Sequence, residues 1–222
     1  SKECTLILTE GDSAKSMAIA GLSVIGRTKY GVFPLKGKVL NVRDASSNEI
    51  LKNTEIANVK KILGLQSNKN YTKEELEKSW PLRYGKIMIM TDQDLDGSHI
   101  KGLCINMFHS EWGSLVKIPG FISFMNTPIL RAKKGSQIKL FYNDGEYNDW
   151  KKTFGTNGPV GWTIKYFKGL GTSTSSEFKD YFANKKIVDF VHNGQSSDDM
   201  IDKIFNKKRA DDRKHWLENY DK

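Results

Sequence analysis

Short apolar runs alternate with amphipathic segments along the first half of the chain. The runs are bounded by turn-forming residues, which is typical of buried strands, and the amphipathic segments keep the spacing of one helix face. The predicted strands cover residues 5–9, 31–34, 86–90 and 121–125. The predicted helices cover residues 13–21, 54–63 and a segment that begins near Ser98. This alternation predicts an α/β fold of the βαβ type, with a largely parallel sheet flanked by helices.

Two further features of this half bear on the core. The helix after Ser98 carries apolar residues at helical spacing, which are expected to face the core rather than a site. They are Ile100, Leu103, Cys104, Met107 and Phe108. Residues 66–78 are strongly polar, so we expect them to form a solvent-exposed excursion.

The second half of the chain has a different pattern. Thr174 and Glu177 have the spacing of a capping box, which predicts a helix that continues to Ala183. The other expected elements are strands over residues 127–133, 137–142 and 162–167, a short helix over 145–153 and a basic helical region over 197–219.

These patterns divide the chain into two parts. We expect an α/β domain over residues 4–123, whose sheet closes near residue 123, and an α+β extension over residues 124–222. The chain does not begin with methionine and opens almost inside a strand, so we expect a fragment of a longer protein.

Acidic side chains follow two of the predicted strands. Glu10 comes directly after the first strand, and Asp92, Asp94 and Asp96 follow the strand over residues 86–90. Ligands of such sheets gather outside the carboxyl ends of the strands, which is where these side chains are expected to lie. Several converging carboxylates repel one another unless a cation neutralises them. Hard oxygen ligands suit Mg²⁺ or Ca²⁺ and not Zn²⁺.

Two other interpretations of the second acidic motif are weaker. An EF-hand would need a preceding helix and a bidentate Glu at its twelfth position, where this chain has Leu103. A phosphatase of the haloacid-dehalogenase type would use the first Asp of Asp94-Leu95-Asp96-Gly97 as a nucleophile at the end of the strand. In this chain, residues 91–93 separate Asp94 from the strand over residues 86–90. Glu10 would also have no role in such an enzyme.

Charge favours a polyanionic partner. The 222 residues include 35 Lys and Arg against 26 Asp and Glu, a net charge of +9. No acidic residue lies between Asp12 and Asp44, whereas six basic residues do. A basic stretch that begins beside a carboxylate cluster suits a site that holds a metal and a phosphate backbone together.

The remaining composition excludes other classes of site. Cys4 and Cys104 are far apart and form no CxxC motif, so we expect free thiols. The four histidines are scattered, which gives no support to a histidine metal site. No apolar run approaches the roughly 18 residues of a membrane span, so no membrane association is expected.

The acidic motifs, together with three other segments, resemble a known family. The two motifs are similar to those of the TOPRIM domain, a Rossmann-like α/β fold. Residues 30–43, 168–175 and 207–214 then match, in order, the central region of the eukaryotic type IIA DNA topoisomerases. The resemblance runs from about Cys4 to about Trp216, and five motifs in sequence are far more specific than a lone DxDxD.

The resemblance implies a role for individual residues. Glu10 and Asp92 would hold the catalytic metal, and Asp94 and Asp96 would take part in a second metal position. The implied DNA contacts are Lys36, Lys38, Asn41, Arg213 and Lys214. The metal would be Mg²⁺, with Mn²⁺ or Ca²⁺ able to substitute in binding. ATP would act only through an ATPase domain that this chain does not contain.

The resemblance also implies the function of the parent protein. This chain would be the metal-binding half of the DNA cleavage-religation site of a nuclear, homodimeric enzyme that passes one duplex through another. The fragment alone is expected to be inactive, because the family's nucleophilic tyrosine lies on a winged-helix domain downstream. Tyr84 follows Arg83, as that tyrosine follows an arginine, but it reads as a structural turn. Alternatives are another TOPRIM enzyme (a primase or nuclease) or a DNA-binding module without chemistry.

Overall fold

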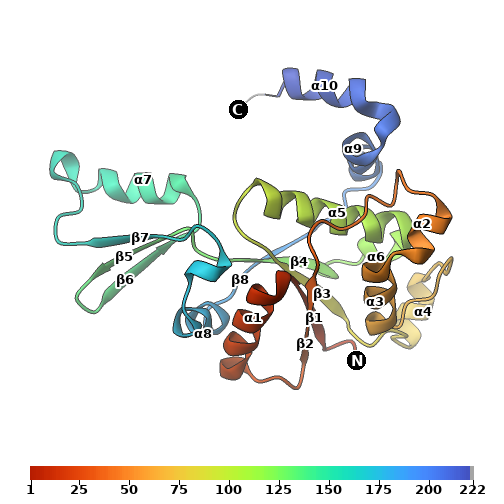
Figure 1. Cartoon of the computed structure of the whole chain (residues 1–222), viewed down its shortest axis with the longest axis horizontal. Coiled ribbons are helices and arrows are strands. Elements are labelled where there is room, and N and C mark those ends of the chain that lie inside the picture. The colour runs from red at the N-terminus through yellow and green to blue at the C-terminus, as the bar shows by residue number, and fades with distance from the viewer. Residues whose placement is uncertain (221–222) are drawn as a thin grey trace.

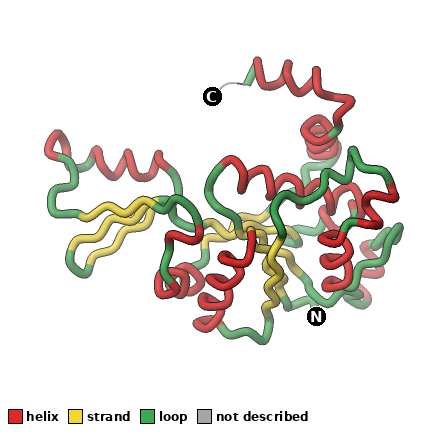
Figure 2. The backbone as a smooth tube through the Cα atoms, in the orientation of Figure 1, coloured by secondary structure: helices red, strands yellow, loops and turns green. Residues whose placement is uncertain are grey.

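The computed structural model describes residues 1–220 as a mixed α/β structure with two sheets (Figures 1 and 2). The strands are β1 (Thr5–Glu10), β2 (Tyr30–Leu35), β3 (Lys86–Met90), β4 (Ile122–Asn126), β5 (Leu130–Lys134), β6 (Gln137–Phe141), β7 (Thr163–Tyr166) and β8 (Lys186–Asp189). The α-helices are α1 (Gly11–Ile25), α2 (Ser47–Lys52), α3 (Thr54–Leu63), α4 (Lys73–Lys78), α5 (Leu95–Glu111), α6 (Gly113–Val116), α7 (Asp144–Lys152), α8 (Ser175–Ala183), α9 (Gln195–Phe205) and α10 (Ala210–Glu218). Short 3₁₀ turns are η1 (Gly155–Asn157), η2 (Leu170–Thr172) and η3 (Lys207–Arg209).

The main sheet has the strand order β2-β1-β3-β4-β8. The first four strands are parallel, and β8 pairs antiparallel with β4 at the edge. Helices α1 and α8 cover one face, and α3, α5 and α6 cover the other (Figure 1). Because the sheet is buried on both faces, its central strands read as continuous apolar runs and not as alternating ones.

The pleat of each central strand sends successive side chains to opposite layers. In β1, Leu6 and Leu8 pack with α3 and α5, whereas Ile7 packs with α1 and α8. In β3, Ile89 packs with α3 and α5, and Met88 packs with α1 and α8. The predicted core positions of α5 are all buried. The expected α/β fold is therefore confirmed.

The second sheet has the order β6-β5-β7 and lies beside the main one, with α7 packed on one face (Figure 1). Its core is largely aromatic. Phe141 and Trp150 have ring centroids 5.1 Å apart, and Trp150 meets Trp162 edge-on at 5.2 Å. The tryptophans of this small sheet are thus packing residues, as such aromatic pairs commonly are.

Several sequence expectations need correction. The main sheet does not close near residue 123, because β8 returns from the extension to pair with β4. The segment over residues 66–78 is not simply exposed, since it contains α4 and its Tyr71 is only 1% exposed. Helix α5 begins at Leu95, earlier than expected, because Asp94 caps it. The basic helical region is two helices, α9 and α10, and α2 was missed.

Among the described residues, no helix is both long enough and apolar enough to cross a membrane.

Candidate metal and nucleic-acid site

Glu10 ends β1 and Asp92 follows β3, so both lie at the carboxyl ends of neighbouring parallel strands. The strands β1 and β3 pair in parallel with Thr9 opposite Met90, so the chain exits both strands side by side. The Asp92 amide nitrogen donates a hydrogen bond to Glu10 Oε2 at 3.2 Å. The two motifs, 82 residues apart in sequence, are therefore in direct contact.

Asp94 and Asp96 lie at the start of α5, beside that pair. Asp94 Oδ1 accepts a hydrogen bond from the Gly97 amide at 2.7 Å and so caps the helix. A Cβ at Gly97 would lie 2.0 Å from the carbonyl oxygen of Asp92, so the close approach of this turn requires glycine. The Asp96 side chain is 70% exposed and pairs with Lys38 Nζ at 2.9 Å.

The extension also reaches this site. The Leu170 amide donates to Asp92 Oδ1 at 2.6 Å. A Cβ at Gly169 would lie 2.7 Å from Asp92 Oδ2, so the loop touches the carboxylate closely. The segment over residues 168–175, one of the motifs matched in the sequence, thus holds one of the candidate ligands in place.

Electrostatics at the site favour a bound cation. Burial raises the pKa of Glu10, and the neighbouring charges of Asp92, Asp94 and Asp96 raise that pKa further against the lowering effect of its hydrogen bond from Asp92. The hydrogen bond and charge of Lys38 lower the pKa of the exposed Asp96. A cation placed among these groups would relieve their mutual repulsion.

The donor set fits a hard divalent ion. All four candidate side chains offer carboxylate oxygens, which Mg²⁺ prefers. Among the described residues, no three of these carboxylates bring oxygens within 4.8 Å of one another. The arrangement is therefore an open one. It suits Mg²⁺, which commonly keeps several waters and takes one or two carboxylates together with substrate phosphates.

The geometry argues against the two rival interpretations. An EF-hand loop would need a ligand at Leu103, but Leu103 is buried in the core. It would also need a helix before Asp92, where β3 lies. In a dehalogenase-type phosphatase the nucleophile ends the strand, whereas Asp94 caps α5.

The basic loop between β2 and α2 lies close to the acidic residues. Lys36 and Lys38 are exposed, and Lys38 reaches Asp96. Asn41 differs, because its side chain is engaged internally: Nδ2 donates to Phe205 O at 2.8 Å and to Asp44, and Oδ1 accepts from Asn106 at 3.0 Å. Its contact with DNA stays a prediction.

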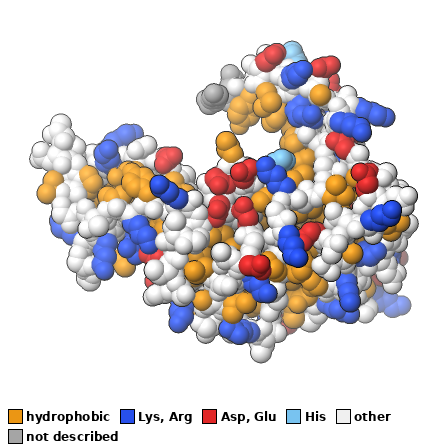
Figure 3. Space-filling model, viewed as in Figure 1, with side chains coloured by type: hydrophobic (Ala, Val, Ile, Leu, Met, Phe, Trp, Pro, Cys, Tyr) orange, Lys and Arg blue, Asp and Glu red, His pale blue; other side chains and the backbone are white. Residues whose placement is uncertain are grey.

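Arg213 and Lys214 lie on α10, far along the chain from the loop. Arg213 donates to the carbonyl oxygens of Lys203 and Asn206 and so satisfies the end of α9. Lys214 is largely exposed and forms a 3.7 Å ion pair with Asp211. Figure 3 shows Asp and Glu side chains gathered near the middle of the viewed face, with Lys and Arg beside them and along α10.

Tyr84 lies away from the candidate metal site. A Cβ at Gly31 would lie 2.2 Å from the Tyr84 hydroxyl oxygen, so this hydroxyl packs against the start of β2. Gly31 pairs with Leu6, four residues before Glu10 on β1, which is a separation of about 13 Å at 3.3 Å per residue. Tyr84 therefore lies near the amino ends of the parallel strands, whereas the carboxylates lie at their carboxyl ends.

Sequence reasoning missed one polar cluster. His109 and His192 both contact Asp198. The expectation that the histidines stay scattered is wrong for these two. Nothing in their spacing indicates the contact, because three separate elements must fold before they meet.

Comparison with known proteins gives a consistent picture. Residues 5–126 match the family model "Toprim domain", and residues 125–222 match "C-terminal associated domain of TOPRIM". The chain is 56% identical to DNA topoisomerase 2 of Plasmodium falciparum (isolate K1 / Thailand), covering 99% of this chain and 15% of that protein. It is 54% identical to human DNA topoisomerase 2-alpha, covering 99% of this chain and 14% of that protein.

A solved structure is similar as well. The crystal structure of the Plasmodium falciparum topoisomerase II DNA-binding, cleavage and re-ligation domain matches with a TM-score of 0.91 and 54% identity, covering 100% of this chain and 30% of that one. The chain thus spans about one seventh of the length of the curated relatives that it matches.

Proposed function

The chain belongs to the Toprim family, and from that premise we propose that it is the metal-binding half of the DNA cleavage-religation site of an ATP-dependent type IIA DNA topoisomerase. The observation that carries the proposal is the contact between Glu10 and Asp92, which joins the two acidic motifs at one sheet edge. A primase or nuclease is disfavoured, because the similarity to DNA topoisomerase 2 extends over the second half of the chain as well.

Each acidic residue has its own part in the proposed site. Glu10 and Asp92 hold the first divalent ion, and Asp94 and Asp96 contribute to a second position. Mg²⁺ is the proposed physiological ion, and Mn²⁺ or Ca²⁺ can occupy the site. When bound, the ion supplies positive charge that stabilises the scissile phosphate and the leaving 3′ oxygen.

The reaction itself is phosphoryl transfer to a tyrosine. The tyrosine oxygen bonds to the phosphorus atom, the bond to the 3′ oxygen breaks, and religation reverses both changes. The family places this tyrosine on a downstream domain. The part of this chain is to bind the duplex backbone through Lys36, Lys38 and α10, and to hold the carboxylates at the phosphate.

The wider setting follows the family. We propose the division into a Toprim domain over residues 4–123 and an extension over residues 124–222. The parent protein is proposed to act as a homodimer in the nucleus, and ATP acts through a separate domain. Duplex DNA is the substrate of the whole enzyme.

Duplex binding offers a direct test of the DNA surface. Lys36 and Lys214 are exposed, and substituting them does not disturb the hydrogen bonds that tie Asn41 and Arg213 into the fold. Because each neutralised phosphate contributes about −0.9 to the slope of log K against log salt, a Lys36→Gln/Lys214→Gln variant should weaken binding and flatten that slope by up to about 1.8.

A matched variant controls for net charge. Lys73→Gln/Lys117→Gln removes the same two charges from exposed positions outside the basic loop and α10. Its salt slope should stay that of the native chain. Equal slopes in the two variants would reject the proposed DNA surface.

The catalytic part of the proposal needs the parent enzyme. There, Asp92→Ala should abolish magnesium-dependent covalent attachment of the protein to a DNA 5′ end. The present chain incubated alone with labelled supercoiled DNA and trapped with detergent should give no covalent product. Attachment to Tyr84 in that trap would overturn the assignment of the nucleophile to another domain.

A further inference from the structure

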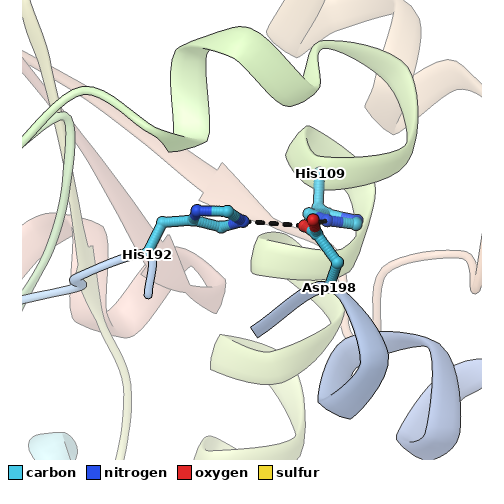
Figure 4. Close-up of side chains that lie close together, drawn as sticks. All are labelled: His109, His192 and Asp198. Carbon is cyan, nitrogen blue, oxygen red and sulfur yellow. Dashed lines mark hydrogen bonds and ion pairs between the residues drawn. The ribbon is translucent and has the colours of Figure 1, made fainter. Parts of the chain in front are cut away.

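Three elements that are distant in sequence meet at the carboxylate of Asp198. His109 lies near the end of α5, His192 follows β8, and Asp198 lies in the first turn of α9 (Figure 4). His109 Nε2 is 2.6 Å from Asp198 Oδ1, and His192 Nε2 is 2.7 Å from the same oxygen.

The surroundings fix which nitrogen of each ring carries the proton. Arg43 Nη2 lies 2.8 Å from His109 Nδ1, and because a guanidinium can only donate, this Nδ1 accepts. The Gly194 amide donates to His192 Nδ1 at 3.2 Å. Both rings therefore carry their proton on Nε2 and donate to Asp198. These two hydrogen bonds lower the pKa of Asp198 to about 2.

The donor role of both Nε2 atoms argues against a metal ion at the cluster. A metal would need the lone pair of each Nε2, but both Nε2 atoms are protonated donors. Moving the proton of His109 to Nδ1 would direct it at Arg43, which has no acceptor to offer. The permanent positive charge of Arg43 beside the ring opposes a cation further. His109, His192 and Asp198 therefore form a hydrogen-bonded cluster that connects α5 to α9, and we call this cluster the joint.

The joint extends through Arg43 to the basic loop. Arg43 Nε donates to Asn106 on α5 at 3.0 Å, and Nη1 donates to Asp202 on α9 at 3.2 Å. Next to it, the Lys207 amide donates to Asp44 at 2.8 Å. One network thus ties the loop, α5 and α9 together.

This network lies between the two parts of the proposed DNA surface, the basic loop and α10. Helix α10 projects beyond the rest of the fold and is joined to α9 by the short turn η3 (Figure 1). Helix α9 meets α5 and the basic loop at the joint. The orientation of α10 relative to the loop therefore depends on these contacts.

We propose that Arg43, His109, His192 and Asp198 are positioning residues that hold α9 and α10 at a fixed orientation to the basic loop, so that Lys214 and Lys36 contact one duplex. This inference rests on the proposed DNA-binding function. It assigns the histidines no contact with DNA and no part in the phosphoryl transfer. Their effect on binding is through the placement of α10.

The variant Asp198→Ala separates this role from simple electrostatics. Removing an acidic side chain beside a DNA surface strengthens binding if only charge matters. If the joint positions α10, Asp198→Ala should instead bind duplex DNA severalfold more weakly than the native chain. The salt slope flattens by about 0.9, because the α10 contact is lost. Amide hydrogen exchange should accelerate in α9 and α10 and stay unchanged in β1 and β3.

Three further variants complete the test. Asp149→Ala removes the same charge from an exposed position on α7 and should leave DNA binding, salt slope and exchange unchanged. Asp198→Asn keeps an acceptor oxygen for the rings and should restore part of the affinity. His192→Ala removes one hydrogen bond and should give an intermediate effect even if Asp198→Ala proves too unstable to purify.

The outcomes distinguish the two levels of the proposal. If the native chain binds no duplex, the DNA-binding function fails and the joint's role fails with it. If the native chain binds and Asp198→Ala keeps its affinity, slope and exchange rates, only the joint is rejected. Calorimetric uptake of Zn²⁺ by the native chain that His109→Ala and His192→Ala abolish would show a metal site instead and overturn the assignment.

Discussion

Replacing Gly169 with alanine should weaken metal binding without unfolding the protein. The added Cβ would lie 2.7 Å from Asp92 Oδ2, 3.0 Å from Cγ and 3.2 Å from Oδ1. Gly169 has φ 162°, an extended conformation open to any residue, so the backbone itself is not strained. The atom that must move is the end of a flexible side chain. The cost therefore falls on the position of the Asp92 carboxylate and not on the fold.

The size of the effect follows from what that displacement breaks. The Asp92 carboxylate loses its 2.6 Å hydrogen bond from Leu170, a partner that orients a candidate ligand. Losing such an orienting contact typically costs about 10- to 100-fold in metal affinity. We expect a loss of that size for Mg²⁺ by calorimetry and for Mn²⁺ by paramagnetic NMR.

A neighbouring glycine supplies the matched control. A Cβ at Gly171 meets nothing within 4 Å, so Gly171→Ala should bind metal as the native chain does. Thermal unfolding of both variants should stay close to that of the native chain. If Gly169→Ala binds Mg²⁺ as tightly as Gly171→Ala, the claim that this loop positions Asp92 is refuted.

Two further predictions concern stability. Burial alone would raise the pKa of Glu177, but hydrogen bonds and the charges of Lys165 and Arg131 hold that pKa below its ordinary value of 4.5. Glu177 therefore stabilises the fold above about pH 4.5, and this contribution is lost as pH falls through the lowered pKa. Glu177→Gln should lower the free energy of unfolding, measured with urea, by about 1–3 kcal/mol at pH 7. It should also make that free energy less dependent on pH in the acid range. An unchanged pH dependence would contradict this account. Asn41→Ala should lower the free energy of unfolding by about 1–3 kcal/mol, because the buried Asn106 Nδ2 loses its acceptor, Asn41 Oδ1. A variant of normal stability but weaker DNA binding would instead identify Asn41 as a DNA contact.

Local signals in the sequence were sufficient for many elements. The strand over residues 86–90 and the helix over residues 54–63 were predicted with the observed bounds, because both sit between clear turn signals. The capping box of Thr174 and Glu177 forms as expected, since its hydrogen bonds span only three residues. Such features depend on neighbours along the chain, which the sequence displays directly.

Features that depend on distant contacts were missed. Strand β8 has four exposed residues and therefore no burial pattern; its pairing with β4 is what makes it a strand. Helix α5 starts at Leu95, which is 90% exposed and gives no core signal. The contact of Leu170 with Asp92 likewise joins residues that are 78 positions apart.

The central claim is that the two acidic motifs form one divalent-metal site. Calorimetric titration of Mg²⁺ into the native chain, Glu10→Gln and Asp94→Asn tests it most directly. The native chain should bind weakly, because the open site keeps waters and awaits a phosphate, and both variants should bind more weakly still. Normal binding by Glu10→Gln together with lost binding by Asp94→Asn would contradict the claim, since the first motif would then contribute nothing.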